Sequence, residues 1–183
     1  MTTRPRVDSP KQFGDPGAGT FWVEYPSGLV DITRSHALET SADEPPKLSA
    51  GQHEIPVEND RTIRYDAEKS AIVIIDMQNF FLHPELRAHP LGLKCVDPLI
   101  NVVTHFRKTG VKIIWVNWGL TETELHTIPP SLSRSFSKGG RGGFGSEMGG
   151  KWGRLLMRDQ FNSELYGPLQ KEYEEGKKNG TDI

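Results

Sequence analysis

The sequence predicts an α/β protein with a parallel sheet, and three neighbouring segments carry that prediction. Residues 71–75 form an apolar run of mostly β-branched side chains, which is typical of a strand buried on both faces of a parallel sheet. Residues 111–118 form a second such run. Between them, the apolar side chains that recur at the spacing of an amphipathic helix are Val96, Leu99, Ile100, Val103 and Phe106. A strand, a helix and a strand in this order predict a β-α-β unit with parallel strands.

The first 60 residues are predicted to form an N-terminal extension outside that domain. Residues 1–20 are rich in Pro, Gly, Asp and Lys, a composition typical of a disordered arm. Residues 21–34 differ, because apolar and polar side chains alternate on both sides of Pro26-Ser27-Gly28, which predicts a β-hairpin. Residues 35–52 return to the composition of a linker.

The predicted domain covers residues 61–183 and begins with a short strand at residues 62–65. After the β-α-β unit, residues 121–126 predict a short helix that ends before two prolines. The glycines of residues 138–145 lack the spacing of a phosphate-binding P-loop, so a flexible loop is favoured. The remaining residues are strongly charged and show no further apolar strand. Two strands and one helix are too little for a stable parallel sheet, so the sequence predicts an incomplete domain.

Composition and charge restrict the classes of function. The chain has 183 residues, a formal net charge of −2 and no basic stripe, so no nucleic-acid partner is expected. No apolar run approaches the length of a membrane span, and no secretory signal is visible, so a cytoplasmic protein with no membrane partner is expected. Cys95 is the single cysteine, which excludes an intramolecular disulfide and a cysteine-based metal site. We expect a small-molecule substrate and leave a homo-oligomer open.

Asp76 is the strongest candidate for chemistry, because it directly follows the strand at residues 71–75. Ligands of open α/β sheets bind at the carboxyl ends of the strands. The competing interpretation is that Asp76 caps the following turn. Cys95 has no His or Asp partner at a suggestive spacing, so an inert, partly buried thiol is favoured over a nucleophile. His83 and His89 share no helix face and have no matching acid nearby, so we expect neither a metal nor another cofactor.

The segment Ile74-Ile75-Asp76-Met77-Gln78-Asn79-Phe80-Phe81 resembles the first-strand motif of the isochorismatase-like cysteine hydrolases, an apolar run followed by D-M-Q-N-D-F. The resemblance covers about residues 60–130, and Phe80 stands where the family motif has its second acidic residue. It implies a Rossmann-like fold, a three-layer α/β/α sandwich around a parallel sheet. It also implies hydrolysis of a small amide or ureido compound, or of a vinyl ether.

By this resemblance, Asp76 is the general base of a Cys–Asp–Lys triad, and we expect Phe81, Asn117 and Trp118 to line the substrate pocket. The family's lysine and cysteine belong to the region after residue 183, and neither Cys95 nor Lys151 is in a position to replace them. The residues that follow Asn117 also lack the D-x-H pattern of the zinc-binding members. The chain alone is therefore predicted to be an inactive amidohydrolase. The alternatives are a shortened relative that acts as a binding or partner subunit, and an unrelated flavodoxin-like module.

Overall fold

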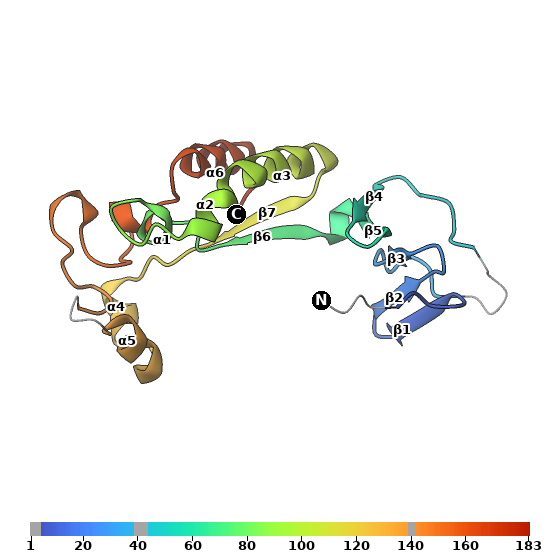
Figure 1. Ribbon diagram of the computed structural model, residues 1–183, viewed down its shortest axis with the longest axis horizontal. Coiled ribbons are helices and arrows are strands. Elements are labelled where there is room, and N and C mark those ends of the chain that lie inside the picture. Colours follow the sequence, from blue (N-terminus) through green and yellow to red (C-terminus); the bar gives the residue numbers. More distant parts are fainter. Residues whose placement is uncertain (1–4, 39–43, 139–141) are drawn as a thin grey trace. The chain divides into compact units, whose positions relative to one another are not determined.

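The structure is a computed structural model with mixed α/β architecture, and Figure 1 shows the arrangement of its elements. The residues that it describes are 5–38, 44–138 and 142–183. The chain divides into an N-terminal unit, Met1–Ala71 with Thr109–Lys112, and a C-terminal unit, which comprises Ile72–Lys108 and Ile113–Ile183.

The N-terminal unit is a five-stranded mixed sheet in the order β1-β2-β3-β5-β4. Only β3 and β5 run parallel, and the other neighbours are antiparallel. The strands are β1 (Lys11–Asp15), β2 (Thr20–Glu24), β3 (Leu29–Asp31), β4 (Gln52–Val57) and β5 (Arg61–Asp66). The predicted strand at residues 62–65 is therefore confirmed. However, it pairs within this sheet, so the structure divides the chain at Ala71 rather than at residue 60.

The β2–β3 hairpin confirms the prediction for residues 21–34. Its turn closes with the N–H of Tyr25 on the carbonyl of Leu29 at 2.9 Å, and Gly28 adopts φ 92° there. The predicted disorder of residues 1–20 is wrong for β1. That strand pairs along its whole length with β2, and the rings of Phe13 and Trp22 stack with 5.3 Å between their centroids. Residues 1–4 lie outside the described part.

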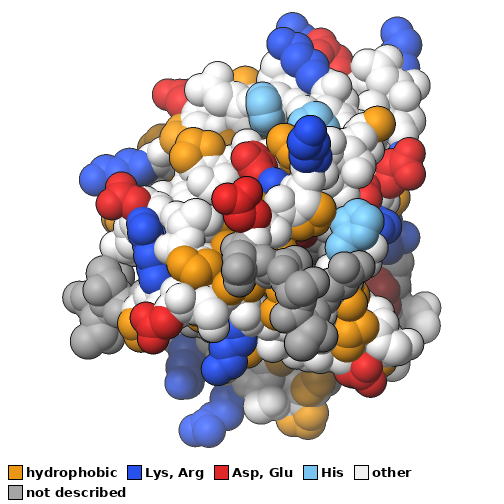
Figure 2. Space-filling model, turned by 90° about the vertical axis from the view of Figure 1, so that its right-hand side faces the viewer, with side chains coloured by type: hydrophobic (Ala, Val, Ile, Leu, Met, Phe, Trp, Pro, Cys, Tyr) orange, Lys and Arg blue, Asp and Glu red, His pale blue; other side chains and the backbone are white. Residues whose placement is uncertain are grey.

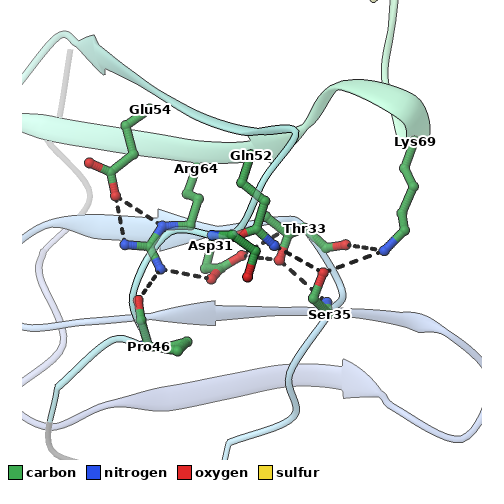
Figure 3. Close-up of polar contacts among 9 residues, drawn as sticks. Asp31, Thr33, Ser35, Pro46, Gln52, Glu54, Arg64 and Lys69 are labelled. Carbon is green, nitrogen blue, oxygen red and sulfur yellow. Dashed lines mark hydrogen bonds and ion pairs between the residues drawn. The ribbon is translucent and has the colours of Figure 1, made fainter.

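An ionic network centred on the buried Arg64 joins β3, β4 and β5 in this unit, and the exposed Glu54 forms its outer end (Figure 3). Arg64 is 5% exposed and donates from Nε and Nη2 to Glu54 at 2.9 and 2.7 Å. Its Nη1 donates to the carbonyl of Pro46 at 2.7 Å and lies 3.6 Å from Asp31. Asp31 in turn accepts from the N–H and hydroxyl of Thr33 at 2.9 and 2.7 Å. These side chains satisfy one another, which is the condition for burying charge.

The surface drawn in Figure 2 shows basic and acidic side chains interspersed. Among the described side chains on that face, no continuous basic stripe is visible.

The C-terminal unit contains the predicted β-α-β unit, with β6 (Ala71–Ile75), α3 (Val96–Thr109) and β7 (Lys112–Val116). The other α-helices are α1 (Asn79–Leu82), α2 (Pro90–Lys94), α4 (Glu122–Leu125), α5 (Pro130–Phe136) and α6 (Pro168–Asn179). Short 3-10 helices accompany them at Gly150–Trp152 and Phe161–Ser163, and a further one, Ala67–Lys69, belongs to the N-terminal unit. The predicted helix at residues 121–126 is confirmed as α4, whose capping box involves Thr121 and Glu124. Helix α4 ends before the two prolines, as predicted, and these are the N-cap and the first residue of α5, because proline is well suited to the first turn of a helix.

Helices α3 and α6 cover one face of the β6–β7 sheet (Figure 1). The core of that face includes Ile74, Val103, Ile113 and Leu169. On the opposite face, Val73, Ile75 and Val116 are 52%, 60% and 45% exposed. The expectation that β6 is buried on both faces is therefore wrong within the described residues.

Residues 181–183 lie beside β7 and extend its hydrogen-bond ladder. The N–H of Ile113 donates to Thr181 at 3.3 Å, Ile183 donates to Ile113 at 2.9 Å, and Trp115 donates to Ile183 at 2.9 Å. The pairing of Ile113 with Asp182 is parallel. The prediction that no further apolar strand follows the charged residues is confirmed for the described residues, because residues 181–183 add an isolated bridge and not a strand.

Candidate functional site

Asp76 lies directly after β6, where its own N–H donates to the carbonyl of Val116 at 3.0 Å. Its backbone adopts the left-handed conformation, with φ 58°. This conformation is uncommon outside glycine, and Asp and Asn are among the residues that tolerate it best. Asp76 therefore lies in the turn at the carboxyl end of β6, and ligands of α/β sheets bind at the carboxyl ends of their strands.

The electrostatic surroundings of Asp76 make it a candidate for proton transfer. The side chain is half-buried, and this burial raises the pKa of its carboxyl above the ordinary aspartate value. A hydrogen bond from the Trp118 side chain acts in the opposite direction but does not cancel the effect of burial. Asp76 is thus a carboxylate whose charge is only weakly stabilised.

Gln78 fixes the position of Trp118. It is fully buried, and its amide oxygen accepts from the Trp118 N–H at 2.9 Å while its Nε2 donates to the Trp118 carbonyl at 2.6 Å. The same Nε2 donates to the carbonyl of Ser163 at 2.5 Å. One side chain thereby ties the segment after β6 to the segment after β7. It holds Trp118 next to Asp76 through the backbone.

The other residues of the D-M-Q-N string have structural contacts. Met77 is 9% exposed and belongs to the core under the sheet. Asn79 is the first residue of α1, and its Nδ2 donates to the carbonyl of Phe161 at 2.8 Å. Asp76 is therefore the member of the string whose side chain is available for chemistry.

A cavity of about 420 Å³ opens beyond the carboxyl end of β7. The sequence-predicted residues Asn117 and Trp118 line it, whereas Asp76 and Phe81 are not among its lining residues. The other lining residues are Trp115, Gly119, Arg158, Asp159, Ser163, Glu164, Leu165, Gln170 and Tyr173. Sequence reasoning missed all of these, because most come from the irregular segment and helix that follow residue 157, and no periodicity relates them to β7.

Phe81 lies instead in an aromatic cluster next to the site. Its ring meets that of Phe80 edge to face at 5.0 Å, and the guanidinium of Arg87 lies 4.6 Å from the Phe80 ring centre. Trp118 reaches the same cluster through Phe144, with 5.0 Å between ring centroids. Trp118 therefore connects Asp76, the cavity and the cluster.

The remaining candidates do not gather around Asp76. Cys95 ends α2 and is exposed, so the prediction of a partly buried thiol is wrong. Lys151 pairs with Glu85 at 3.5 Å on the surface. His83 packs edge to face on Trp152 at 4.8 Å, and His89 accepts from the N–H of Gly92 at 3.1 Å. No group of three potential metal-ligating His, Cys, Asp or Glu side chains occurs within residues 5–38, 44–138 and 142–183.

Comparison with known proteins identifies no relative: no model of a protein family matches the chain, and no curated protein sequence matches it. In the part of the chain that the structure describes, no helix is both long and apolar enough to cross a membrane.

Proposed function

We propose that the C-terminal unit belongs to an isochorismatase-like cysteine hydrolase that cleaves a C–N bond in a small amide or ureido compound. Its complete fold in this proposal is a three-layer α/β/α sandwich. Asp76 is the general base, and Asn117 and Trp118 form part of the substrate pocket. The observation that carries the proposal is the left-handed, half-buried Asp76 with a raised pKa at the carboxyl end of a parallel strand.

The proposed role follows from proton-transfer chemistry. A base is most effective when its pKa lies near the working pH, and burial moves the pKa of Asp76 in that direction. A cysteine thiol, with a pKa of about 8.5, needs such a base and a nearby cation to become an effective nucleophile. Asp76 would take the thiol proton, and the thiolate would attack the carbonyl carbon of the substrate. Asp76 would return the proton to the amine as the C–N bond breaks, and water would then hydrolyse the acyl thioester.

The described residues supply the base and part of the pocket in this scheme, but Cys95 is exposed at the end of α2. We therefore predict that the 183-residue chain alone releases no ammonia from small amides. The exposed thiol also favours the second candidate function, a catalytically inactive binding or partner subunit. Both candidates require the cavity to bind a small amide, and they differ in whether turnover follows once a nucleophile is present.

The test uses the full chain with acetamide and N-carbamoylglycine, measuring ammonia release together with the indole N–H resonances. We expect no ammonia and a saturable shift of the Trp118 resonance. Asp76→Asn should change the pH dependence of that shift, whereas Asp97→Asn on the exposed surface of α3 should leave it unchanged. Ammonia release that Cys95→Ala abolishes would show that Cys95 is a nucleophile and overturn the predicted inactivity. If neither compound shifts Trp118, Asp76 does not face a substrate of this class.

A further inference from the structure

Trp152 and Phe161 form a pair of aromatic rings in the C-terminal unit that buried polar side chains hold in place. The Nδ2 of Asn162 donates to the carbonyl of Trp152 at 2.7 Å, and the Nδ2 of Asn79 donates to the carbonyl of Phe161 at 2.8 Å. Both asparagines are buried. The two ring centroids lie 5.7 Å apart, with an angle of 49° between the ring planes. Trp152 is half-buried and Phe161 is 37% exposed, so solvent reaches this fixed, angled pair.

The ammonium group of Lys151 already occupies the ring pair. Its Nζ lies 4.5 Å from the ring centre of Trp152 and 5.7 Å from that of Phe161, within the range of a cation–π interaction. The carboxylate of Glu85 lies 3.5 Å from the same Nζ. Two aromatic faces and one carboxylate therefore surround a single positive charge.

Lys151 occupies this place without being tightly held there. The side chains of Lys151 and Glu85 are 52% and 65% exposed, and ion pairs of such exposure contribute little to stability. A lysine ammonium is also strongly hydrated and is carried by a flexible stem of four carbons, so it can move into solvent without a change of the backbone. A cation that is less strongly hydrated can therefore take its place.

We propose that Trp152, Phe161 and Glu85 form a binding site for a methylated ammonium group, and that Lys151 fills this site when no ligand is bound. Aromatic faces attract quaternary ammonium groups, and the carboxylate supplies the opposite charge. A metal ion of the calcium or magnesium class fits poorly, because it requires several oxygen ligands, whereas the surroundings of the Lys151 Nζ consist of one carboxylate and two rings. The inference does not depend on the proposed hydrolase activity.

The first test compares choline with its carbon analogue, in which a neutral tert-butyl group replaces the trimethylammonium group. The two compounds have the same shape, so a difference in binding reports the charge. Both are titrated into the full chain, and the indole N–H resonance of Trp152 is followed. We expect a saturable shift with choline at millimolar concentration and binding of the neutral analogue that is weaker by about tenfold.

Three variants test the assigned roles in the same titration. Lys151→Ala should bind choline about threefold more tightly, because it removes the competing ammonium group. Glu85→Gln should bind choline about threefold more weakly, because it removes the opposite charge. Lys171→Ala is the matched control, since it removes a lysine from the exposed Lys171–Glu175 pair on α6, and it should leave the affinity unchanged.

A second probe, acetyl-Nε-trimethyllysine methylamide, distinguishes two sources of the methylated ammonium group. Tighter binding of this probe than of choline would identify a methylated lysine side chain as the ligand. Weaker binding would identify a free quaternary ammonium compound.

Other outcomes overturn the proposal. Equal binding of choline and its neutral analogue would show that the rings recognise apolar shape and not charge. If choline shifts the Trp152 resonance in neither the wild type nor Lys151→Ala, the ring pair is not a ligand site. Weaker choline binding by Lys151→Ala would show that Lys151 does not compete with the ligand. Unchanged binding by Glu85→Gln would remove the carboxylate from the site.

Discussion

Two carboxylates lie near opposite ends of the parallel sheet in the C-terminal unit, and their surroundings shift their pKa values in opposite directions. Asp182 pairs with Ile113 near the start of β7, and its side chain is fully buried. It accepts from Arg107 Nε at 2.9 Å and Nη2 at 2.6 Å, from Trp115 Nε1 at 2.8 Å and from Thr181 Oγ1 at 2.8 Å. Asp76 follows β6, and a hydrogen bond from Trp118 is the one favourable contact that lowers its pKa.

The difference separates a carboxylate whose charge the fold stabilises from one whose charge it disfavours. Burial raises the pKa of Asp182, but the hydrogen bonds from Arg107, Trp115 and Thr181 outweigh burial, so its pKa lies below the ordinary value. Burial prevails at Asp76, so its pKa lies above the ordinary value. The number of donors, more than the degree of burial, decides which charge the fold stabilises.

The largest effect on stability is expected from removing the Asp182 carboxylate. Asp182→Ala leaves Arg107, which is 16% exposed, without the carboxylate that accepts two of its hydrogen bonds. Arg107 keeps its ion pair with Glu172, so we expect the free energy of unfolding at pH 7 to fall by about 3 kcal/mol, the low end of the usual cost of breaking a buried ion pair. Urea unfolding followed by tryptophan fluorescence measures it. Asp97→Ala on α3 should change the value by less than about 0.5 kcal/mol.

The pH dependence of this loss has a definite sign. Because the pKa of Asp182 is lowered by folding, its stabilisation is complete above the ordinary aspartate pKa of about 4 and disappears as the pH falls through the lowered value. The difference between the wild type and Asp182→Ala should therefore shrink in acid. A difference independent of pH would mean that packing, rather than charge, accounts for the loss.

A second substitution tests the surroundings of Asp76 by changing Gln78, the residue that positions Trp118. Gln78→Met keeps the volume but leaves the Trp118 N–H and the carbonyls of Trp118 and Ser163 without this partner. We expect a loss of about 1 to 3 kcal/mol, the cost of burying unsatisfied polar groups. Gln160→Met removes one acceptor, that of the Arg154 N–H, and should cost less.

The Gln78 variant also has a spectroscopic outcome. If Gln78 positions Trp118, the indole N–H resonance of Trp118 should shift in the variant, and its dependence on the ionisation of Asp76 should weaken. An unchanged Trp118 resonance together with lost stability would show that Gln78 is structural and does not influence the site.

The local patterns of the sequence predicted the β-α-β unit, the β2–β3 hairpin and α4, because these depend on periodicity, turn residues and caps. The candidate Asp76 was found for the same reason, as a carboxylate at the end of an apolar run. The structural role of Asp182 could not be predicted from the sequence. The residues that donate hydrogen bonds to it lie up to 75 residues away along the chain, and no periodic pattern relates them to it. Strand β1 was missed for a different reason: it pairs with the neighbouring β2 across a short turn, although its composition resembles an unfolded arm. The exposed face of β6 was also missed, because an apolar run does not reveal whether one or both faces are covered.

The smallest expected effect is that of Asp76→Asn. This substitution should raise the free energy of unfolding at pH 7, whereas Asp182→Ala should lower it. Asp76→Asn keeps the shape and the tolerance for φ 58° but removes the charge. Because folding raises the pKa of Asp76, the wild type loses stability as the pH rises from about 4 through the raised value, and the loss persists at neutral pH. The variant should therefore be more stable than the wild type at pH 7 and equally stable at pH 3. Paired urea titrations at the two pH values measure this. A variant that is less stable at pH 7 would show that the Asp76 charge is stabilised by folding, as at Asp182, and would remove the physical argument for a general base there.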